Sequence, residues 1–304
     1  MGYVLLGLLA GIVLPVQTGV NTRLKEKIGT SERSACVSFV VGTLFLMLVL
    51  LVTGATRLHL QGDNPWWIWI GGALGVVFLV GNLRIYPYLG GTMTVILPAA
   101  GQIFMGLLVD HFGWFQSEVH PLTVLRGAGA VVVLLGVVIN SMDHGGKTDR
   151  KESGKMLWIL CLVGIAIGMI SAAQTAINAR LGIVLNDPVQ AATVSFSLGA
   201  VLLILLCLTP PQRKAPYGDS HGNKGPVWVW LGGILGTIFV LTNLYVAGKI
   251  GTGMAVIASL TGTMIGGIVI DHLGVLGAEK KPVNLQKIGG TLLVLAGAVM
   301  VRLL

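Results

Sequence analysis

The sequence predicts an all-α integral membrane protein with ten transmembrane helices, arranged as two inverted five-helix repeats. Three observations support this fold: the scarcity of charge, ten charge-free stretches and an internal repeat. Of the 304 residues, 54% are hydrophobic and 11% are charged. A soluble globular protein carries roughly 25% charged residues, so this chain has too little charge to cover a surface that faces water.

The transmembrane helices are expected where the chain contains no Asp, Glu, Lys or Arg. Eight of the ten charge-free stretches hold at least 20 residues, which at about 1.5 Å per residue crosses a hydrocarbon core of about 30 Å. The fifth and the tenth, with 16 and 14 residues, are short for a span. In chain order the stretches cover residues 1–22, 34–56, 64–83, 85–109, 127–142, 156–179, 188–212, 225–248, 250–270 and 288–301.

An internal repeat divides the chain into two similar units. Residues 11–42 align without a gap with residues 168–199, with 11 identities in 32 positions. Residues 65–113 align in the same way with residues 226–274, with 19 identities in 49 positions. We call two residues at aligned positions of the units sister residues. The predicted division is a first unit at residues 1–142, a linker at residues 143–155 and a second unit at residues 156–304.

The distribution of cations predicts the orientation. Five crossings are an odd number, so the second unit enters the membrane in the opposite direction from the first. Of the 20 Lys and Arg residues, 15 lie on the side of the loops that follow predicted helices 1, 3, 5, 7 and 9. Because cytoplasmic loops are enriched in Lys and Arg, we expect the linker in the cytoplasm and both termini outside. The net charge of +8 is then explained by cations in the cytoplasmic loops, and it does not indicate nucleic-acid binding.

Three motifs that occur in both units suggest a family. They are Gln-Thr-x-(Val/Ile)-Asn-x-Arg-Leu from Gln17 and Gln174, Trp-x-Trp-(Ile/Leu)-Gly-Gly from Trp67 and Trp228, and Asp-His-(Phe/Leu)-Gly from Asp110 and Asp271. Together they resemble the YdcZ family of the drug/metabolite transporter superfamily, almost from end to end. The resemblance implies a small-molecule permease of the inner membrane and names no cargo. Two inverted units can also open a shared cavity to either side in turn, so the architecture indicates a secondary transporter.

Polar side chains in the charge-free stretches are candidates for gates. Such side chains face a cavity or a partner helix because exposure to lipid is costly. Those of the first unit lie toward the cytoplasmic ends of their helices, and their sisters lie toward the external ends. They would form a gate on each face, or hold neighbouring helices together by hydrogen bonds. The two clusters are Gln17, Asn21, Ser38 and Asn82, and their sisters Gln174, Asn178, Ser195 and Asn243.

A substrate pocket is expected near the middle of the membrane, where a few hydrogen-bonding groups meet aromatic rings. Core packing is the other interpretation of these residues. Arg84 alone interrupts a long apolar region, and would pair with an anionic substrate group or reach to the cytoplasmic interface. The predicted substrate-binding residues are Gln102, Thr263, Thr261, Ser259, Arg84, Phe78 and Phe239.

The repeated Asp-His segments are the candidates for proton coupling. Small multidrug exporters of the same superfamily bind a proton or a cationic drug at a glutamate of the first helix, where this chain offers only Gln17. The remaining titratable candidates are Asp110, His111, Asp271 and His272. Arg126 and Lys287 follow the two aspartates by 16 residues, so we predict the ion pairs Asp110–Arg126 and Asp271–Lys287. These pairs would serve structure or proton coupling.

Small residues predict which helices pack closely. The spacing GxxxG lets two helix backbones approach, and it occurs at Gly7/Gly11, Gly164/Gly168, Gly71/Gly75 and Gly232/Gly236. We therefore expect predicted helices 1, 3, 6 and 8 to form an inner bundle. The three cysteines, Cys36, Cys161 and Cys207, lie in apolar stretches without CxxC spacing and are expected to be packing residues.

Two other functional classes remain as alternatives, an intramembrane enzyme acting on a lipid-linked substrate and a passive channel. The sequence contains no HExxH, no GxSxG and no clustered carboxylates for an enzyme. A channel requires a polar stripe through both units, whereas the polar clusters lie at opposite faces. We therefore expect no catalytic residue, no metal and no cofactor. The expected partners are a small-molecule substrate and the lipid bilayer, with a monomer containing both repeats and a homodimer as the alternative.

Overall fold

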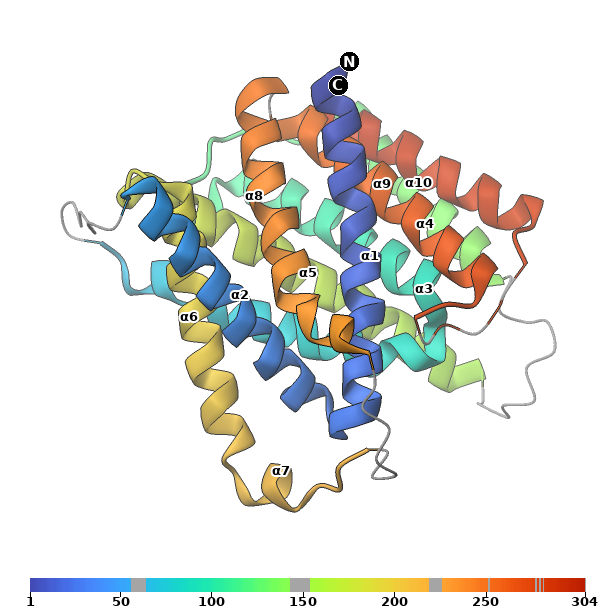
Figure 1. Cartoon of the computed structure of the whole chain (residues 1–304). Helices are drawn as coiled ribbons and strands as arrows, with labels where there is room; N and C mark the ends of the chain where they lie inside the picture. Colours follow the sequence, from blue (N-terminus) through green and yellow to red (C-terminus); the bar gives the residue numbers. More distant parts are fainter. Residues whose placement is uncertain are drawn as a thin grey trace.

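The computed structural model describes residues 1–55, 64–142, 154–218, 226–250, 252–276, 278, 280 and 282–303. This part of the chain is helical and contains no strand. The helices form one bundle, and the start of α1 and the end of α10 are drawn in the upper part of the view (Figure 1). The predicted linker at 143–155 falls almost entirely outside the described residues.

The helices follow the charge-free stretches and extend beyond several of them into charged residues. The longer ones are α1 Gly2–Ile28, α2 Ser31–Thr53, α3 Gly71–Phe112, α4 Val124–Met142, α5 Gly154–Val184, α6 Pro188–Cys207, α8 Gly232–Ile250, α9 Thr252–Leu273 and α10 Leu285–Leu303. Four short elements connect them: η1 Trp66–Trp69, η2 Trp114–Gln116, α7 Pro210–Lys214 and η4 Val227–Leu231.

Sister residues begin two of these helices in the same way. The Thr30 side chain accepts a hydrogen bond from the backbone N–H of Arg33 at the start of α2. Its sister Asp187 accepts from the backbone N–H of Val189 at 2.7 Å at the start of α6. Side chains of this kind satisfy the free N–H groups of a first helical turn and fix where the helix begins.

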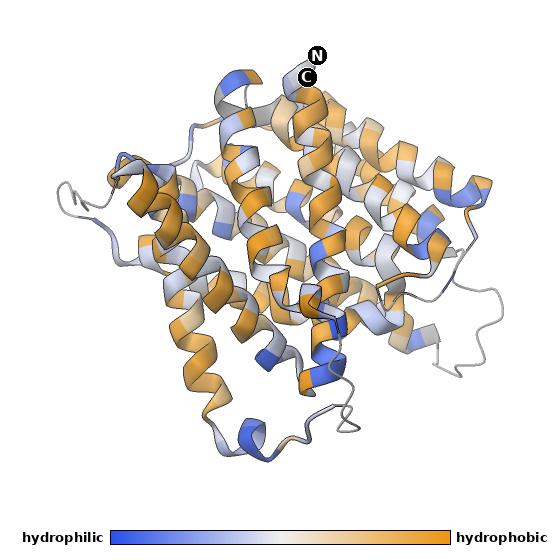
Figure 2. Ribbon diagram, viewed as in Figure 1, coloured by the Kyte–Doolittle hydropathy of each residue, from blue (hydrophilic) through white to orange (hydrophobic). Residues whose placement is uncertain are grey.

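Seven of the described helices are long and apolar enough to cross a membrane, and α4 and α10 contain shorter apolar segments. Hydrophobic residues dominate the helices, and hydrophilic residues gather at helix ends and in connections (Figure 2). This distribution fits a multi-pass membrane protein.

Helix α3 contains a break that the sequence placed elsewhere. The charge-free stretches end and resume at Arg84, which predicted a boundary there. Arg84 instead lies within the helix, and the break is at Gly90, with φ of 77° and ψ of 179°. A glycine adopts this backbone conformation without a clash at Cβ. The 42-residue helix is therefore two helical segments, 71–89 and 91–112, joined at Gly90.

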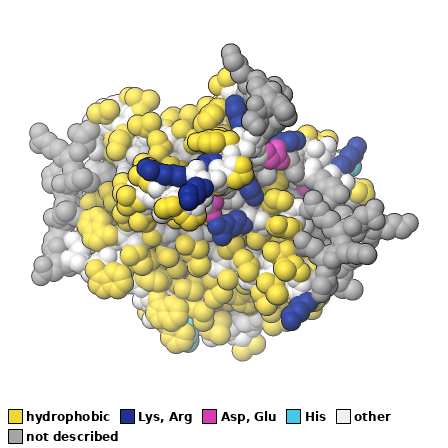
Figure 3. Space-filling view, turned by 90° about the horizontal axis from the view of Figure 1, so that it is seen from below, with side chains coloured by type: hydrophobic (Ala, Val, Ile, Leu, Met, Phe, Trp, Pro, Cys, Tyr) yellow, Lys and Arg dark blue, Asp and Glu magenta, His cyan; other side chains and the backbone are white. Residues whose placement is uncertain are grey.

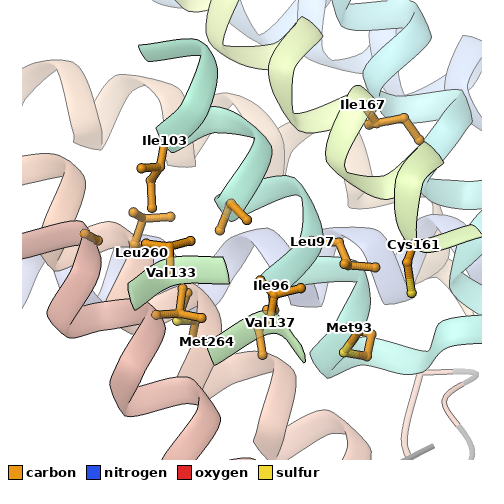
Figure 4. Close-up of a cluster of buried hydrophobic side chains, with 14 of the residues drawn as sticks. Met93, Ile96, Leu97, Ile103, Val133, Val137, Cys161, Ile167, Leu260 and Met264 are labelled. Atoms are coloured by element: carbon orange, nitrogen blue, oxygen red, sulfur yellow. The ribbon is translucent and has the colours of Figure 1, made fainter. Parts of the chain in front are cut away.

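The centre of the bundle is filled by apolar side chains. Met93, Ile96 and Leu97 of α3 pack there with Val133 of α4 and Met264 of α9 (Figure 4). Helices α5 and α10 contribute further residues to the same cluster.

Predicted helices 1, 3, 6 and 8 correspond to α1, the first segment of α3, α5 and α8. The prediction that they form the inner bundle was wrong, because the buried residues of α3 lie mostly in its second segment. Of the candidate spans, α3 and α9 are the most buried, and α1, α5 and α8 are less so. The glycine pairs do mark close contacts, as predicted, but they lie where the less buried helices meet α3 and α9 or the amide side chains of the other unit.

Candidate functional site

The first-unit polar cluster brings together α1, α2 and α8. The Ser38 hydroxyl donates to Asn21 Oδ1 at 2.5 Å, and both side chains are buried. The Asn21 side chain lies against Gly232, where a Cβ would be 2.0 Å from Oδ1. Gln17 lies one turn earlier on α1, against Gly236. The amides of one unit therefore pack on bare glycine backbone of the other.

The second-unit cluster repeats this arrangement with the units exchanged. Asn178 of α5 lies against Gly71 of α3, again with a Cβ-to-Oδ1 distance of 2.0 Å, and Gln174 lies against Gly75. The carbonyl oxygen of Ser195 approaches Gly72 in the same way that the Ser38 carbonyl approaches Gly233. The contact between amide and glycine thus occurs twice, once at each sister position.

Asn82 and Asn243 make different contacts from the other members of the clusters. Asn82 is buried on α3, and its Oδ1 has no hydrogen-bond partner within the described part of the chain. Its sister Asn243 donates from Nδ2 to the carbonyl oxygen of Phe239, at 2.9 Å within α8.

The polar residues predicted for the substrate pocket lie in helix contacts in this conformation. The Thr263 hydroxyl is within hydrogen-bonding distance of the carbonyl oxygens of Gly11, at 3.1 Å, and Ser259, at 2.7 Å. Ser259 and Thr261 each donate to a carbonyl of their own helix. Gln102, the sister of Thr263, donates to the Ser171 hydroxyl of α5 at 3.3 Å. Gln102 therefore lies at the contact α3–α5, and Ser259 and Thr263 lie at the contact α1–α9.

The predicted aromatic residues are partly buried. Phe78 packs against the central apolar cluster, as does Phe104. Phe239 lies on α8 and is half-buried. Whether these rings contact a substrate stays a prediction.

Arg84 is paired with a carboxylate that the sequence analysis missed. It forms an ion pair with Glu32 of α2, whose side chain is 6% exposed, while the Arg84 side chain is 65% exposed. Lys25 of α1 donates to the carbonyl oxygen of Leu83 beside this pair, at 3.1 Å. The signal for Glu32 is its place in the first turn of α2, where a helix favours negative charge.

The predicted ion pair Asp110–Arg126 is confirmed. Arg126 Nη2 lies 2.6 Å from Asp110 Oδ2. The same guanidinium donates from Nε to the carbonyl oxygen of Val301 in α10, and from Nη1 to that of His120. Arg126 thus connects the end of α3, the following loop and the end of the second unit. His111 lies nearby at the surface, where its Nδ1 accepts from the backbone N–H of Leu122.

The second predicted pair, Asp271–Lys287, is also confirmed, and it is deeply buried. Lys287 Nζ lies 3.6 Å from Asp271 Oδ2, with side chains 1% and 2% exposed. Asp271 also accepts from the backbone N–H groups of Gly91, at 2.6 Å, and Thr92, at 2.9 Å, and from the Thr92 hydroxyl. These are the first residues after the break at Gly90. His272, the neighbour of Asp271, is exposed.

The contact between Asp271 and α3 could not have been found in the sequence. An aspartate near the C-terminus of its own helix is unfavourable. Here it sits at the positive N-terminus of a different helical segment, which α3 exposes only because it breaks at Gly90. The repetition of Asp110 and Asp271 marked both residues, but their partners on α3 depend on the tertiary structure.

Charged residues gather on the face that contains the end of α1, the start of α2 and α7 (Figure 3). Arg33 donates to the carbonyl oxygens of Ile28 and Ala215 and lies over the Tyr217 ring at 4.3 Å. Lys27 lies 5.5 Å from the centre of the Trp230 ring. These contacts place several of the predicted cytoplasmic cations together on one face.

A hollow of about 270 Å³ opens between the end of α3 and α4. Its lining is apolar except for the His111 side chain. The described residues contain no group of three or more His, Cys, Asp or Glu side chains that could hold a metal ion.

Comparisons with known proteins identify relatives of the chain. The family model described as "Putative inner membrane exporter, YdcZ" matches residues 2–139 and 159–300. Inner membrane protein YdcZ of Escherichia coli (strain K12) is 29% identical over 131 residues, which are 42% of this chain and 86% of that protein. A solved crystal structure superposes on 99% of the chain and on 96% of its own, with a TM-score of 0.64 and 17% identity, which establishes a shared fold alone.

Proposed function

The chain belongs to the YdcZ family of the drug/metabolite transporter superfamily, and from this premise we propose that it exports a small polar or amphipathic organic solute across the inner membrane by alternating access. The family is one of membrane exporters and not of enzymes, so the transported solute is not chemically changed. The description of the family suggests the outward direction.

The proposed architecture is two inverted five-helix units in one chain. The E. coli relative is about half as long as this chain, because 86% of it aligns with 42% of the present residues. The family match also falls into two segments on either side of the linker. Nine long helices are described, and the break at Gly90 divides α3 into two segments, which supports ten crossings in all. With both units in one chain, a monomer is sufficient for transport.

The observation that carries the proposal is the exchange of contacts between sister residues. The backbone of Gly11 lies against Ser259, and the backbone of Gly168 lies against Pro98. Gly168 is the sister of Gly11, and Pro98 is the sister of Ser259. Each unit therefore packs on the other through equivalent surfaces. If the two units exchange their conformations, the side of the molecule that is closed becomes open, which is the structural basis of alternating access.

We propose that the substrate site lies between the contacts α1–α9 and α3–α5, at Gln102, Ser259, Thr261 and Thr263. Their hydroxyls and amide now bond to backbone or to Ser171, so they can exchange these partners for a solute when the units separate. Phe78 and Phe239 would supply apolar contact. Arg84, held by Glu32 near the end of the first segment of α3, would attract anionic groups of a solute that enters from the predicted cytoplasmic side.

The two clusters of amides and hydroxyls would act as gates. Asn21 and Gln17 close on the glycines of α8, and Asn178 and Gln174 close on the glycines of α3. An amide side chain can move away from a glycine without side chains having to slide past one another, because glycine has no side chain that interdigitates with it. This property suits a contact that forms and separates in each transport cycle.

Proton coupling would use the Asp-His segments. Of the two aspartates, Asp110 is the more accessible, with a side chain 19% exposed against 2% for Asp271. We therefore propose Asp110, with His111 beside it, as the residue to test for dependence on a proton gradient. If Asp110→Asn retained a full response of transport to the gradient, proton coupling at this position would be excluded.

The experiment that tests the function begins with purified protein and a panel of metabolites. A solute present at 100 times its Kd should stabilise the protein by about 2.7 kcal/mol, which is measurable as a rise in Tm. Stabilising solutes are then loaded into proteoliposomes, and uptake of labelled solute is measured with and without unlabelled solute on the opposite side. A transporter gives counterflow, whereas a passive channel gives none.

A matched pair of variants connects that transport to the proposed site. Gln102→Leu should lower uptake at least several-fold because it removes the amide and keeps the size of the side chain. Thr53→Val lies at the exposed end of α2 and should leave uptake unchanged. Absence of any stabilising solute together with absence of counterflow would refute the proposed function.

A further inference from the structure

Sister residues on the two sides of the molecule differ in burial. Met93, at the start of the second segment of α3, is 1% exposed, whereas its sister Met254 in α9 is half-buried. Leu83 is 0% exposed and its sister Leu244 is 38% exposed. Asn21 is fully buried, and its sister Asn178 is only half-buried.

The more buried members share one side of the bundle. Asn21 is near the end of α1, Leu83 is near the end of the first segment of α3, and Met93 follows the break at Gly90. The cation distribution predicts that this side is cytoplasmic. Two equivalent sets of residues in one chain would be equally buried if both sides were equally closed, so the difference identifies the closed side.

The Asp271 side chain joins the two units on that side, at the break in α3. Asp271 belongs to α9 of the second unit, and it accepts hydrogen bonds from Gly91 and Thr92 in α3 of the first unit. A carboxylate at a helix N-terminus satisfies free N–H groups and interacts favourably with the helix dipole. Because Asp271 is enclosed, these interactions are not weakened by water.

The surroundings of Asp271 make this contact costly to lose. Lys287 Nζ is buried and has no hydrogen-bond partner among the described residues. The Asp271 carboxylate, 3.6 Å away, therefore offsets the cost of burying the positive charge of Lys287. The buried Tyr86 hydroxyl also has no hydrogen-bond partner in the described part of the chain. Separation of α9 from α3 would expose the Asp271 carboxylate, Lys287 Nζ and the Tyr86 hydroxyl to water at the same time. The contact therefore has two states, one closed without water and one open and hydrated.

We propose that Asp271 is the positioning residue that holds the cytoplasmic side of the transporter closed, and that this structure is the conformation closed to the inside. The proposal rests on alternating access as the proposed function. The corresponding pair on the external side, Asp110–Arg126, is partly exposed and leaves that side the more open one. Loss of the Asp271 charge shifts the population toward the conformation that is open to the cytoplasm.

The test measures accessibility from each side of the membrane. In a background with Cys36, Cys161 and Cys207 replaced by Ser, single reporters Met93→Cys and Met254→Cys are labelled with a membrane-impermeant maleimide. Intact cells and inside-out vesicles expose the two sides separately. We expect labelling of Met254→Cys from outside and protection of Met93→Cys from both sides.

Variants of the contact should then reverse the pattern. With Asp271→Asn, labelling of Met93→Cys from the cytoplasmic side should rise about tenfold, within the range of known couplings, and labelling of Met254→Cys should fall. Thr92→Val removes one donor and keeps the size of the side chain, so it should give a smaller change in the same direction. It also tests the proposal if Asp271→Asn does not fold. Asp271→Glu, which keeps the charge, should restore part of the protection.

The outcomes separate this proposal from the others. If neither Asp271→Asn nor Thr92→Val changes the two rates in opposite directions, Asp271 does not control the cytoplasmic side. The same pattern with the compartments exchanged would confirm the closed side and overturn its cytoplasmic assignment. A failure of the proposed function would instead appear as absence of counterflow, whatever the labelling shows.

Discussion

The backbone of Gly11 lies so close to Ser259 that a Cβ on Gly11 would stand 2.0 Å from the Ser259 carbonyl oxygen. The sister contact has the same geometry, because a Cβ on Gly168 would stand 2.0 Å from the carbonyl oxygen of Pro98. At both places the two units touch through their main chains, without intervening side chains. Close backbone approach of this kind is how small residues join helices inside a membrane.

Substitution of either glycine should therefore destabilise the protein. Gly11→Ala and Gly168→Ala each force the helices apart, and overpacking of this kind costs about 1–3 kcal/mol. The measurement is the midpoint of thermal unfolding in detergent. Gly127→Ala is the control, because a Cβ at that position would contact no atom within 4 Å. Equal midpoints for all three variants would contradict the packing described for α1–α9 and α3–α5.

Arg126 should contribute more to stability than an exposed arginine. Arg126→Ala removes the partner of Asp110 and three hydrogen bonds to main-chain carbonyls. Breaking a fully buried pair typically costs about 3–5 kcal/mol, which is an upper bound here because the Asp110 side chain is 19% exposed. We expect a large fall in the unfolding midpoint, which Arg126→Lys restores only in part because Lys lacks the guanidinium fork.

The control for Arg126 is Arg23→Ala. Arg23 forms an exposed pair with Glu26, with side chains 45% and 52% exposed, and such pairs contribute about 0–1 kcal/mol. A fall as large for Arg23→Ala as for Arg126→Ala would show that burial is not what distinguishes the two arginines.

The orientation can be tested by labelling single cysteines in intact cells. Glu118→Cys lies in the loop between α3 and α4, where the native side chain is 86% exposed, and we expect it to react with an impermeant maleimide from outside. A cysteine in the linker at 143–155 should react only after the cells are opened. Reaction of the linker cysteine in intact cells would reverse the predicted topology.

Cys36 and Cys207 should form a disulfide when the protein is oxidised. Their thiols lie close enough to interact with each other, and although they belong to different units, both are free thiols. With a protease site inserted in the linker, oxidation by copper phenanthroline should keep the two halves together on a non-reducing gel. Cys36→Ser should abolish the cross-link, and Cys161→Ser should leave it intact.

The sequence predicted the ion pairs correctly and the partners of other polar residues incompletely. The pairs Asp110–Arg126 and Asp271–Lys287 could be predicted from the sequence. Two helices joined in a hairpin bring residues on either side of the loop to the same depth in the membrane, so residues at this spacing along the chain lie close together in space. Glu32 was missed as the partner of Arg84 because the two residues belong to different helices, α2 and α3. The sequence does not show how these two helices pack against each other. The substrate and gate residues were identified by polarity within apolar stretches, which shows what is costly to expose but not what each residue contacts.

The sequence by itself determined that this chain is a membrane protein, that it contains a repeated unit and that it belongs to the YdcZ family. These conclusions depend on composition, hydropathy and repeated motifs, which can be read without knowing how the helices pack. Only the tertiary structure decided that α3 breaks at Gly90 and that Asp271 of the second unit caps the segment after the break. Both depend on which helices approach one another, and that is set by close packing of glycine backbones and buried side chains across the two units. The same packing buries the side of the molecule that contains Met93 more deeply than the side that contains Met254.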